Sequence, residues 1–204
     1  MSHNAPILLL ASSSERRSAL LNQIGVRHLI LSADIPEIPG PLELAEAYVT
    51  RIALEKARAV SHRPEALELP ILGADTEVVL DGRIFGKPES VDEAAAMLSR
   101  LSGREHFVLS AVALLHQGEV HTALSVSQVR LRTLTSTEIG DYLETGEPFG
   151  KAGAYAIQGL AAVFIERLSG SYSGVMGLPL HETAHLLSGI GIEVLGKAKS
   201  PASA

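Results

Sequence analysis

A short apolar run that ends in a serine-rich turn and leads into a helix is the feature that most constrains the fold. Residues 7–11 (ILLLA) predict a buried strand, and residues 15–25 (ERRSALLNQIG) predict a helix that ends at Gly25. The same order of strand and helix recurs at residues 28–33 and 42–62. Because strands and helices alternate in this way, the sequence predicts an α/β fold.

Two predicted hairpins interrupt that alternation. Residues 69–75 predict a buried strand, residues 78–85 a hairpin that turns at Asp81-Gly82, and residues 106–134 a longer hairpin. Hairpins combined with strand-helix units favour a mixed, twisted central sheet with flanking helices over a purely parallel one. The other predicted elements are helices at 91–101, 135–146 (with a Thr135–Glu138 capping box) and 179–189, strands at 161–167 and 192–195, and a loop at 168–177.

The composition favours one globular unit. With 204 residues, 46% of them hydrophobic, we expect a single domain over residues 1–195 and a disordered tail at 196–204. The absence of cysteine excludes a disulfide framework. The apolar run at 7–11 is short and no Lys or Arg precedes it, so we expect a cytoplasmic protein that makes no membrane contact. A net charge of -6 with scattered basic residues disfavours nucleic-acid binding.

The junction of the first strand and the first helix is a candidate anion site. A helix N-terminus presents free backbone N–H groups and the positive end of the helix dipole. Ser12, Ser14, Arg16 and Arg17 add hydroxyl and guanidinium groups to that junction. Two arginines in the first turn oppose the dipole, and a bound phosphate would offset that cost. The alternative is that a serine caps the helix and the arginines are solvated.

Four charged residues further along are candidates for phosphate, metal or proton chemistry. Asp75 follows an apolar strand, where α/β sheets hold reactive groups, and can bind Mg²⁺ or accept a proton from water. Lys87 lies in a Gly-Lys-Pro turn and Lys56 on the apolar side of its helix, and each can meet an anion. Glu37, in a proline-rich loop, can bind a metal or act as a base. The alternatives are an Asx turn, a snorkelling lysine and solvated surface positions.

Gln158 lies in a glycine-rich stretch and is a candidate for base recognition. The stretch from residue 150 to residue 180 is rich in glycine, which suggests that the backbone passes close to another group. A carboxamide presents a donor and an acceptor side by side, which matches the N3–H and O4 edge of uracil or thymine. The alternative is that Gln158 only satisfies the backbone of its own loop.

Together these stretches resemble the Maf family of nucleoside triphosphate pyrophosphatases. The resemblance rests on LASSSERRSALL, DIPE, EKA, GADT, GKP, LSGREH, KAGAYAIQG and GSYSGVMGLPL, in that order, and covers residues 8–187. It implies a Maf/ITPase-like α/β fold with two lobes around a cleft, and a homodimer. GADT and YAIQG resemble the branch that hydrolyses dTTP and UTP, and a role in clearing nucleotide pools or in cell division is implied.

The resemblance also assigns roles to residues of this chain. It implies that Asp75 is the proton acceptor, that Lys56 and Lys87 are catalytic with it, and that Glu37 and Asp75 hold Mg²⁺ or Mn²⁺. The substrate-binding and specificity residues that it implies are Ser12, Arg16, Arg17, Thr76 and Gln158. The expected reaction is attack of water on the α-phosphorus of a nucleoside triphosphate, with the cations stabilising charge on the phosphates.

The chain departs from the family pattern at several positions. Ser13 and Glu15 stand where the family often has Gly and Pro, and Glu77 stands where an aliphatic residue is usual. Pro36 and Gly150 stand where acids are common. Because two acids are missing, the identity of the metal ligands is less constrained than that of the proton acceptor.

Two other functions compete with hydrolysis of nucleotides. His181, Glu182 and His185 form the pattern H-E-x-x-H of zinc peptidases, but a catalytic zinc site needs a third protein ligand. No helix follows His185 to supply that ligand, so the match is interpreted as accidental. A regulator that binds nucleotides without turning them over is the other alternative. Asp75 disfavours it, because a pure binder of phosphates has no use for a carboxylate among its cations.

Overall fold

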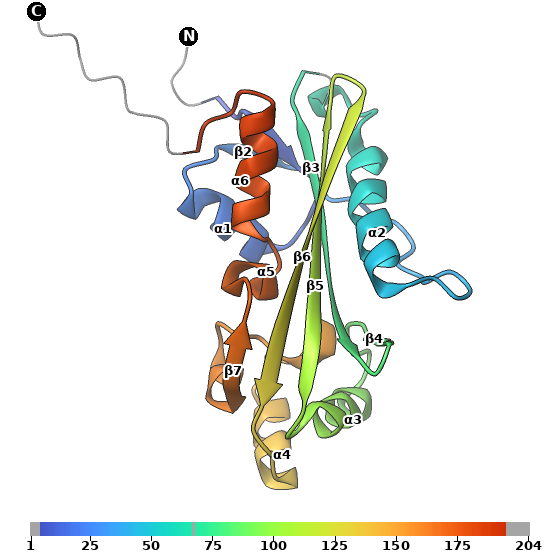
Figure 1. Ribbon diagram of the computed structural model, residues 1–204, viewed down its shortest axis with the longest axis vertical. Coiled ribbons are helices and arrows are strands. Elements are labelled where there is room, and N and C mark those ends of the chain that lie inside the picture. Colours follow the sequence, from blue (N-terminus) through green and yellow to red (C-terminus); the bar gives the residue numbers. More distant parts are fainter. Residues whose placement is uncertain (1–4, 67, 195–204) are drawn as a thin grey trace, which may run out of the picture.

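The computed structural model describes residues 5–66 and 68–194 and contains a seven-stranded mixed sheet (Figure 1). The strands run in the order β2-β1-β3-β5-β6-β7, and β4 pairs with β3. β1 is parallel to β2 and β3, whereas the other pairs are antiparallel, which confirms the predicted mixed α/β sheet. The strands are β1 (Leu8–Leu10), β2 (His28–Ile30), β3 (Ile71–Leu80), β4 (Arg83–Phe85), β5 (Glu105–His116), β6 (Glu119–Leu131) and β7 (Ile165–Ser169).

Helices flank both faces of the long strands β3, β5 and β6 (Figure 1). α2 packs on β3 and β5 from one side, and α6 packs on β5 and β6 from the other. None of the helices in the described part of the chain is long and apolar enough to cross a lipid bilayer. The α-helices are α1 (Glu15–Gln23), α2 (Ala45–Val60), α3 (Val91–Leu101), α4 (Ser136–Glu144), α5 (Tyr172–Met176) and α6 (Leu180–Gly189), and the 3-10 helices are η1 (Pro64–Ala66), η2 (Ala152–Ala154) and η3 (Leu160–Phe164).

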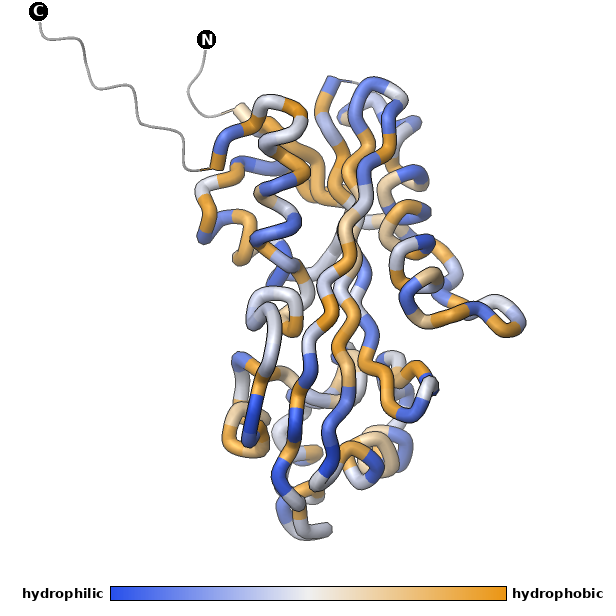
Figure 2. The backbone as a smooth tube through the Cα atoms, in the orientation of Figure 1, coloured by the Kyte–Doolittle hydropathy of each residue, from blue (hydrophilic) through white to orange (hydrophobic). Residues whose placement is uncertain are grey.

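The two largest clusters of buried apolar side chains lie toward opposite ends of the sheet. The upper cluster contains Leu8, Leu72 and Leu187, whereas the lower cluster contains Leu98 and Phe164. In Figure 2 the hydrophobic residues of the upper end concentrate on β1 and the adjoining part of β3. The long strands connect both clusters. A single domain over 1–195 remains a prediction, and the tail predicted at 196–204 lies outside the described residues.

Local chemistry explains the elements that the sequence predicts correctly. Thr135 accepts a hydrogen bond from the Glu138 N–H and the Glu138 carboxylate accepts one from the Thr135 N–H, so the predicted capping box begins α4. The turn between β3 and β4 falls at Asp81-Gly82, and both residues have positive φ angles, 53° and 73°. Such backbone angles match the twist of a tight hairpin, as predicted.

Four predicted elements differ from the structure. Strands predicted at 69–75 and 78–80 are one continuous strand, β3. The strand predicted at 161–167 begins only at Ile165, after η3, and the loop predicted at 168–177 contains α5. Residues 192–194 are not a strand, and residue 195 lies outside the described part. Ile192 N–H instead donates to Leu187 O, an arrangement that ends α6 and becomes accessible because Gly191 adopts φ 83°.

Gly73 allows α2 to pack unusually close to β3. A Cβ atom at this position would lie 2.0 Å from Ala53 O and 2.9 Å from Ala57 N, both of which are backbone atoms of α2. Backbone atoms inside a helix cannot yield as a flexible side chain can. Any side chain at residue 73 would therefore push the helix away from the strand.

Glu77 places a carboxyl group inside the protein, two residues after Asp75 on the same face of β3. It is 5% exposed, and its Oε2 atom has no hydrogen-bond partner in the described part of the chain. Burial, followed by the negative charges of Asp75 and Glu37, raises the pKa of Glu77 from 4.5 to about 8. The folded protein therefore holds a proton on Glu77 at pH values where the unfolded chain has lost it.

We predict that Gly73→Ala destabilises the protein by about 3 kcal/mol, because overpacking against backbone costs this much. For a chain of this size the melting temperature should fall by roughly 6 to 12 °C in calorimetry. Gly140→Ala is the matched control: it lies within α4, and nothing lies within 4 Å of its added Cβ. It should raise stability by up to about 1 kcal/mol. Equal melting temperatures for the two variants would contradict the packing argument.

We predict that Glu77→Gln removes a loss of stability that the wild type suffers at high pH. The folded-state pKa is raised, so the contribution of Glu77 is complete below pH 4.5 and is lost as the pH rises through about 8. The variant should gain a few kcal/mol over the wild type between these pH values, since one pKa unit is worth about 1.4 kcal/mol. Urea unfolding at pH 5 and pH 8 in EDTA measures the effect. Parallel pH profiles for the two proteins would refute it.

Candidate active site

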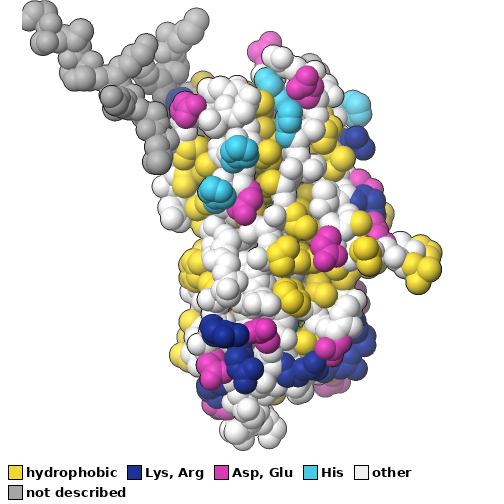
Figure 3. Space-filling model, viewed as in Figure 1, with side chains coloured by type: hydrophobic (Ala, Val, Ile, Leu, Met, Phe, Trp, Pro, Cys, Tyr) yellow, Lys and Arg dark blue, Asp and Glu magenta, His cyan; other side chains and the backbone are white. Residues whose placement is uncertain are grey.

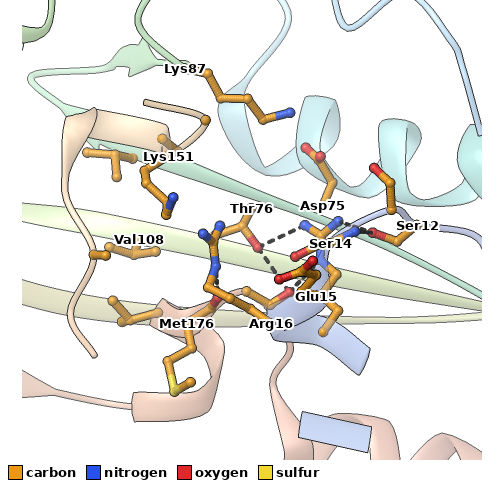
Figure 4. Close-up of a pocket in the computed structure, with 18 of the residues that line it drawn as sticks. Ser12, Ser14, Glu15, Arg16, Asp75, Thr76, Lys87, Val108, Lys151 and Met176 are labelled. Carbon is orange, nitrogen blue, oxygen red and sulfur yellow. Dashed lines mark hydrogen bonds between the residues drawn. The ribbon is translucent and has the colours of Figure 1, made fainter. Parts of the chain in front are cut away.

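A cleft of about 600 Å³ opens beside the middle of β3 (Figure 4). β1 pairs with β3 as far as Leu72, and β4 pairs with it only from Val78 onward. Within the described residues, the stretch between these positions therefore has a strand neighbour on one side alone, β5. The cleft lies at the carboxyl end of the parallel strand β1, where α/β sheets commonly bind ligands.

Lys56 joins two carboxylates at one wall of the cleft. Its Nζ lies 2.7 Å from Asp75 Oδ1 and 2.8 Å from Glu37 Oε1. Lys56 and Asp75 are 5% and 3% exposed, so this ion pair is almost fully removed from water. Asp75 Oδ2 has no partner in the described part of the chain. A buried carboxylate oxygen without a partner costs free energy, and a water molecule or a cation would satisfy it.

Lys87 and Glu37 form the more exposed rim of the same wall. Lys87 Nζ lies 3.3 Å from Glu37 Oε2, and Figure 4 shows Lys87 reaching toward the cleft from the segment before α3. Partial burial tends to raise the pKa of Glu37, but the hydrogen bond and charge of Lys56, with Lys87, hold it below its usual value. Glu37 is therefore ionised and neutralised by two ammonium groups.

Arg17 ties the opposite wall together. Its guanidinium donates to Gly177 O (2.8 Å), Ser12 Oγ (3.1 Å) and Thr76 Oγ1 (3.5 Å). Thr76 Oγ1 also lies 2.8 Å from Ser110 Oγ, so β3 and β5 share the network. Burial lowers the pKa of Arg17, and the nearby carboxylates of Asp75 and Glu37 oppose that effect. Arg17 is thus a fixed positive charge held by hydrogen bonds to three segments of the chain.

The serines before α1 leave its N-terminus open to the cleft. Ser14 is the N-cap residue, but its side chain makes no capping hydrogen bond. Ser12 Oγ accepts from the Ser14 N–H at 3.2 Å as well as from Arg17, so a serine fixes the turn rather than capping the helix. Ser13 and Ser14 both line the cleft. The junction retains the features of an anion site.

Arg16 and Lys151 bring two positive charges toward each other across the cleft (Figure 4). Arg16 Nε donates to Met176 O at 3.2 Å, and Lys151 Nζ donates to Phe149 O at 3.1 Å. Burial, and then the charge of Arg17, lower the pKa of Arg16; burial, and then the charge of Arg16, lower that of Lys151. Cations that repel one another in a cleft favour an anion between them.

Gln158 lines the cleft from the segment between η2 and η3. Its side chain is exposed, and within the described residues its carboxamide makes no hydrogen bond. Within these residues the carboxamide therefore has no bond to its own loop, which is the role that the alternative interpretation gave it. Its donor and acceptor are available to a ligand.

The nine residues to which the family resemblance assigns roles all line this one cleft. They are Ser12, Arg16, Arg17, Glu37, Lys56, Asp75, Thr76, Lys87 and Gln158. Sequence reasoning missed Lys151 and Glu147, which also line it. Lys151 is the first residue of the KAGAYAIQG stretch, which resembles the family. Its place in that stretch is the sequence feature that could have indicated a role in the site. Nothing in the sequence marks Glu147, because the backbone N–H groups that it binds lie thirteen and fourteen residues further along.

The carboxylates of the cleft fit a magnesium-type cation in part. The described residues contain no group of three or more His, Asp or Glu side chains arranged for a metal ion. Mg²⁺ in nucleotide sites, however, is bound by one or two carboxylates, with phosphate oxygens and water completing its shell. Asp75 Oδ2, buried and unpartnered, with Glu37 nearby, meets that lower requirement.

The H-E-x-x-H pattern lies on α6, away from the cleft. His181 and His185 are exposed, and Figure 3 shows histidine side chains on the surface over this helix. Within the described residues no third ligand accompanies them. Thr183 and Leu187 of the same helix are buried against the protein. The helix packs on the sheet, and the zinc peptidase hypothesis gains no support.

Several relatives found by comparison with known proteins carry the same name. A protein of Methylobacillus flagellatus named dTTP/UTP pyrophosphatase is 50% identical, with 96% of this chain and 98% of that protein covered. Proteins of the same name from Methylococcus capsulatus and Burkholderia orbicola are 53% and 54% identical, covering 91% and 89% of this chain and 91% and 92% of those proteins. The solved structure of the Staphylococcus aureus Ham1 protein matches with a TM-score of 0.42 and 14% identity over 61% of this chain and 71% of that chain, too weakly to carry an argument.

The family model described as Maf-like protein matches residues 7–190, which include the whole cleft. The match and the relatives agree with the resemblance drawn from the motifs, and the chain belongs to the Maf family.

Proposed function

We propose that this protein is a nucleoside triphosphate pyrophosphatase that hydrolyses dTTP and UTP to the monophosphate and pyrophosphate. The observation that carries the proposal is the buried Asp75 carboxylate, whose Oδ2 has no partner in the described residues and which lies in a cleft lined by five cations. A site that only bound phosphates would gain nothing from a carboxylate there. The names of relatives that are half identical support the same activity.

Asp75 is the proposed proton acceptor for the attacking water. The water oxygen bonds to the α-phosphorus, the bond from that phosphorus to the bridging oxygen of pyrophosphate breaks, and the water proton passes to Asp75 Oδ2. Lys56 holds Asp75 by its other oxygen, at 2.7 Å, and so fixes the direction in which Oδ2 points. No covalent intermediate with the protein is required.

The cations stabilise the charge that develops on the phosphates. Arg17 and the open N-terminus of α1 lie on one wall of the cleft, and Lys56 and Lys87 lie on the opposite wall. Arg17 is held by Gly177 O and Ser12, so its charge is already oriented before a substrate arrives. Preorganised charge of this kind lowers the barrier because no reorganisation is needed during the reaction.

Glu37 and Asp75 are the residues that we propose hold the divalent cation, Mg²⁺ or Mn²⁺. Such a cation, when bound, neutralises phosphate charge and polarises the attacked phosphoryl group. Lys56 bridges the same two carboxylates, so it keeps them together and limits their repulsion.

Recognition of the base is proposed to rest on three other residues of the cleft. Gln158 offers a donor and an acceptor to the N3–H and O4 edge of thymine or uracil. Thr76 and Arg16 are the other proposed specificity residues; both line the cleft, and Arg16 is anchored by Met176 O. The family resemblance further supports a homodimer in the cytoplasm that clears nucleotide pools, with a link to cell division.

A panel assay tests the proposal directly. The purified protein is incubated with canonical and modified nucleoside triphosphates and Mg²⁺ or Mn²⁺, and pyrophosphate is measured. Release of pyrophosphate from dTTP and UTP ahead of the other nucleotides is the expected result. Tight binding of dTTP without pyrophosphate would favour the nucleotide-binding regulator instead.

We predict that Asp75→Asn lowers turnover of dTTP by at least about 100-fold, because loss of a general base typically costs this much. Asn keeps the shape of the side chain, and Lys56 keeps its contact with Glu37, so the variant should still fold. Asp81→Asn, on the exposed turn that ends β3, is the matched control and should retain wild-type turnover. Wild-type turnover in the folded Asp75→Asn protein would refute the assignment.

We predict that Gln158→Met lowers kcat/KM for dTTP roughly 10- to 100-fold and that for dCTP much less. A site built to hydrogen-bond one base edge loses most of its discrimination when the polar group is removed. Gln23→Met, at the exposed end of α1, is the control and should leave both values unchanged. An equal loss for both nucleotides would argue against base recognition by Gln158.

A further inference from the structure

Glu147 binds the backbone of the segment that carries Gln158. Its Oε2 accepts a hydrogen bond from Leu160 N–H at 2.8 Å, and its Oε1 accepts one from Ala161 N–H at 3.1 Å. Burial tends to raise the pKa of Glu147, but these backbone hydrogen bonds outweigh it and the net pKa lies below the usual value. The carboxylate is therefore ionised, and it binds both N–H groups that begin η3.

Tyr142 holds the same segment on the other side of Gln158. Its hydroxyl donates to Glu147 Oε1 at 2.8 Å and accepts from Ala156 N–H at 3.3 Å. The Tyr142 ring is 4% exposed and packs edge-on against Phe164, with ring centroids 5.2 Å apart. Tyr142 is thus anchored in the lower cluster. Together, Tyr142 and Glu147 hydrogen-bond the backbone two residues before Gln158 and two and three residues after it.

Gly159 shows how closely the segment is drawn to Glu147. A Cβ atom at residue 159 would lie 2.2 Å from Glu147 Oε2. This glycine has φ -107°, which any residue can adopt, so close approach rather than backbone angle accounts for it. The residue next to Gln158 therefore has to lack a side chain for the carboxylate to reach its partners.

We infer that Glu147 and Tyr142 are positioning residues that fix the Gln158 backbone and thereby set the discrimination between bases. The inference rests on the proposed function, in which Gln158 reads the base. Gln158 itself is exposed and makes no hydrogen bond within the described residues, so its backbone anchors restrict where its carboxamide points. A carboxamide that moves by about 1 Å loses much of the selectivity of its hydrogen bonds.

Glu147→Gln and Tyr142→Phe test the inference. Each keeps the shape of its side chain, and each removes an acceptor or a donor from the pair. We expect KM for dTTP to rise about tenfold with little change in kcat, and the preference for dTTP over dCTP to fall about tenfold. Glu144→Gln, an exposed acid three residues before Glu147, is the matched control and should keep wild-type values.

The ratio of kcat/KM for dTTP to kcat/KM for dCTP separates positioning from mere support of the fold. A structural role would lower the melting temperature and the activity on both nucleotides alike, and an unchanged ratio in a soluble Tyr142→Phe protein overturns the inference. That holds even where Glu147→Gln fails to fold. A wild-type protein without activity on dTTP and UTP overturns the proposed function instead, and is recognised before any variant is made.

Discussion

The buried contact between Lys56 and Asp75 is the interaction on which the rest of the site depends. Removing two charges from water costs several kcal/mol for each, and only a short, well-oriented pair offsets this cost. The pair forms because α2 lies almost against β3, and that approach requires Gly73. One glycine in a strand thus sets the distance between helix and sheet, and that distance brings the ammonium within 2.7 Å of the carboxylate.

The two faces of β3 carry different kinds of polar side chain. Asp75 and Glu77 alternate with Thr76, so both acids face α2 while the hydroxyl faces Arg17. The cations that approach from α1 and those that approach from α2 are consequently held on separate walls. A polyanion placed between them meets positive charge on both sides, and Asp75, which lines the cleft, keeps one buried carboxylate oxygen without a partner in the described residues.

Local patterns in the sequence were enough to predict most of the strands, the capping box and the Asp81-Gly82 turn, because each depends on residues a few positions apart. Predictions failed where distant residues decide the structure. Residues 160–164 form η3 because the Glu147 carboxylate binds its first N–H groups, and α5 begins where Ser171 caps it. The site residues were found through motifs and family resemblance, whereas Glu147 acts only through contacts that need the folded chain.

The two main apolar clusters support different groups of site residues. α1, which supplies Arg16 and Arg17, packs through Leu20 and Leu21 into the upper cluster. The segment that carries Gln158 is held by Tyr142, which belongs to the lower cluster. The long strands run through both clusters, and Met176 of α5 packs against both, so these elements fix the distance between phosphate chemistry and base recognition. A substitution in the lower cluster can therefore alter which base is accepted while the phosphate groups and Asp75 remain in place.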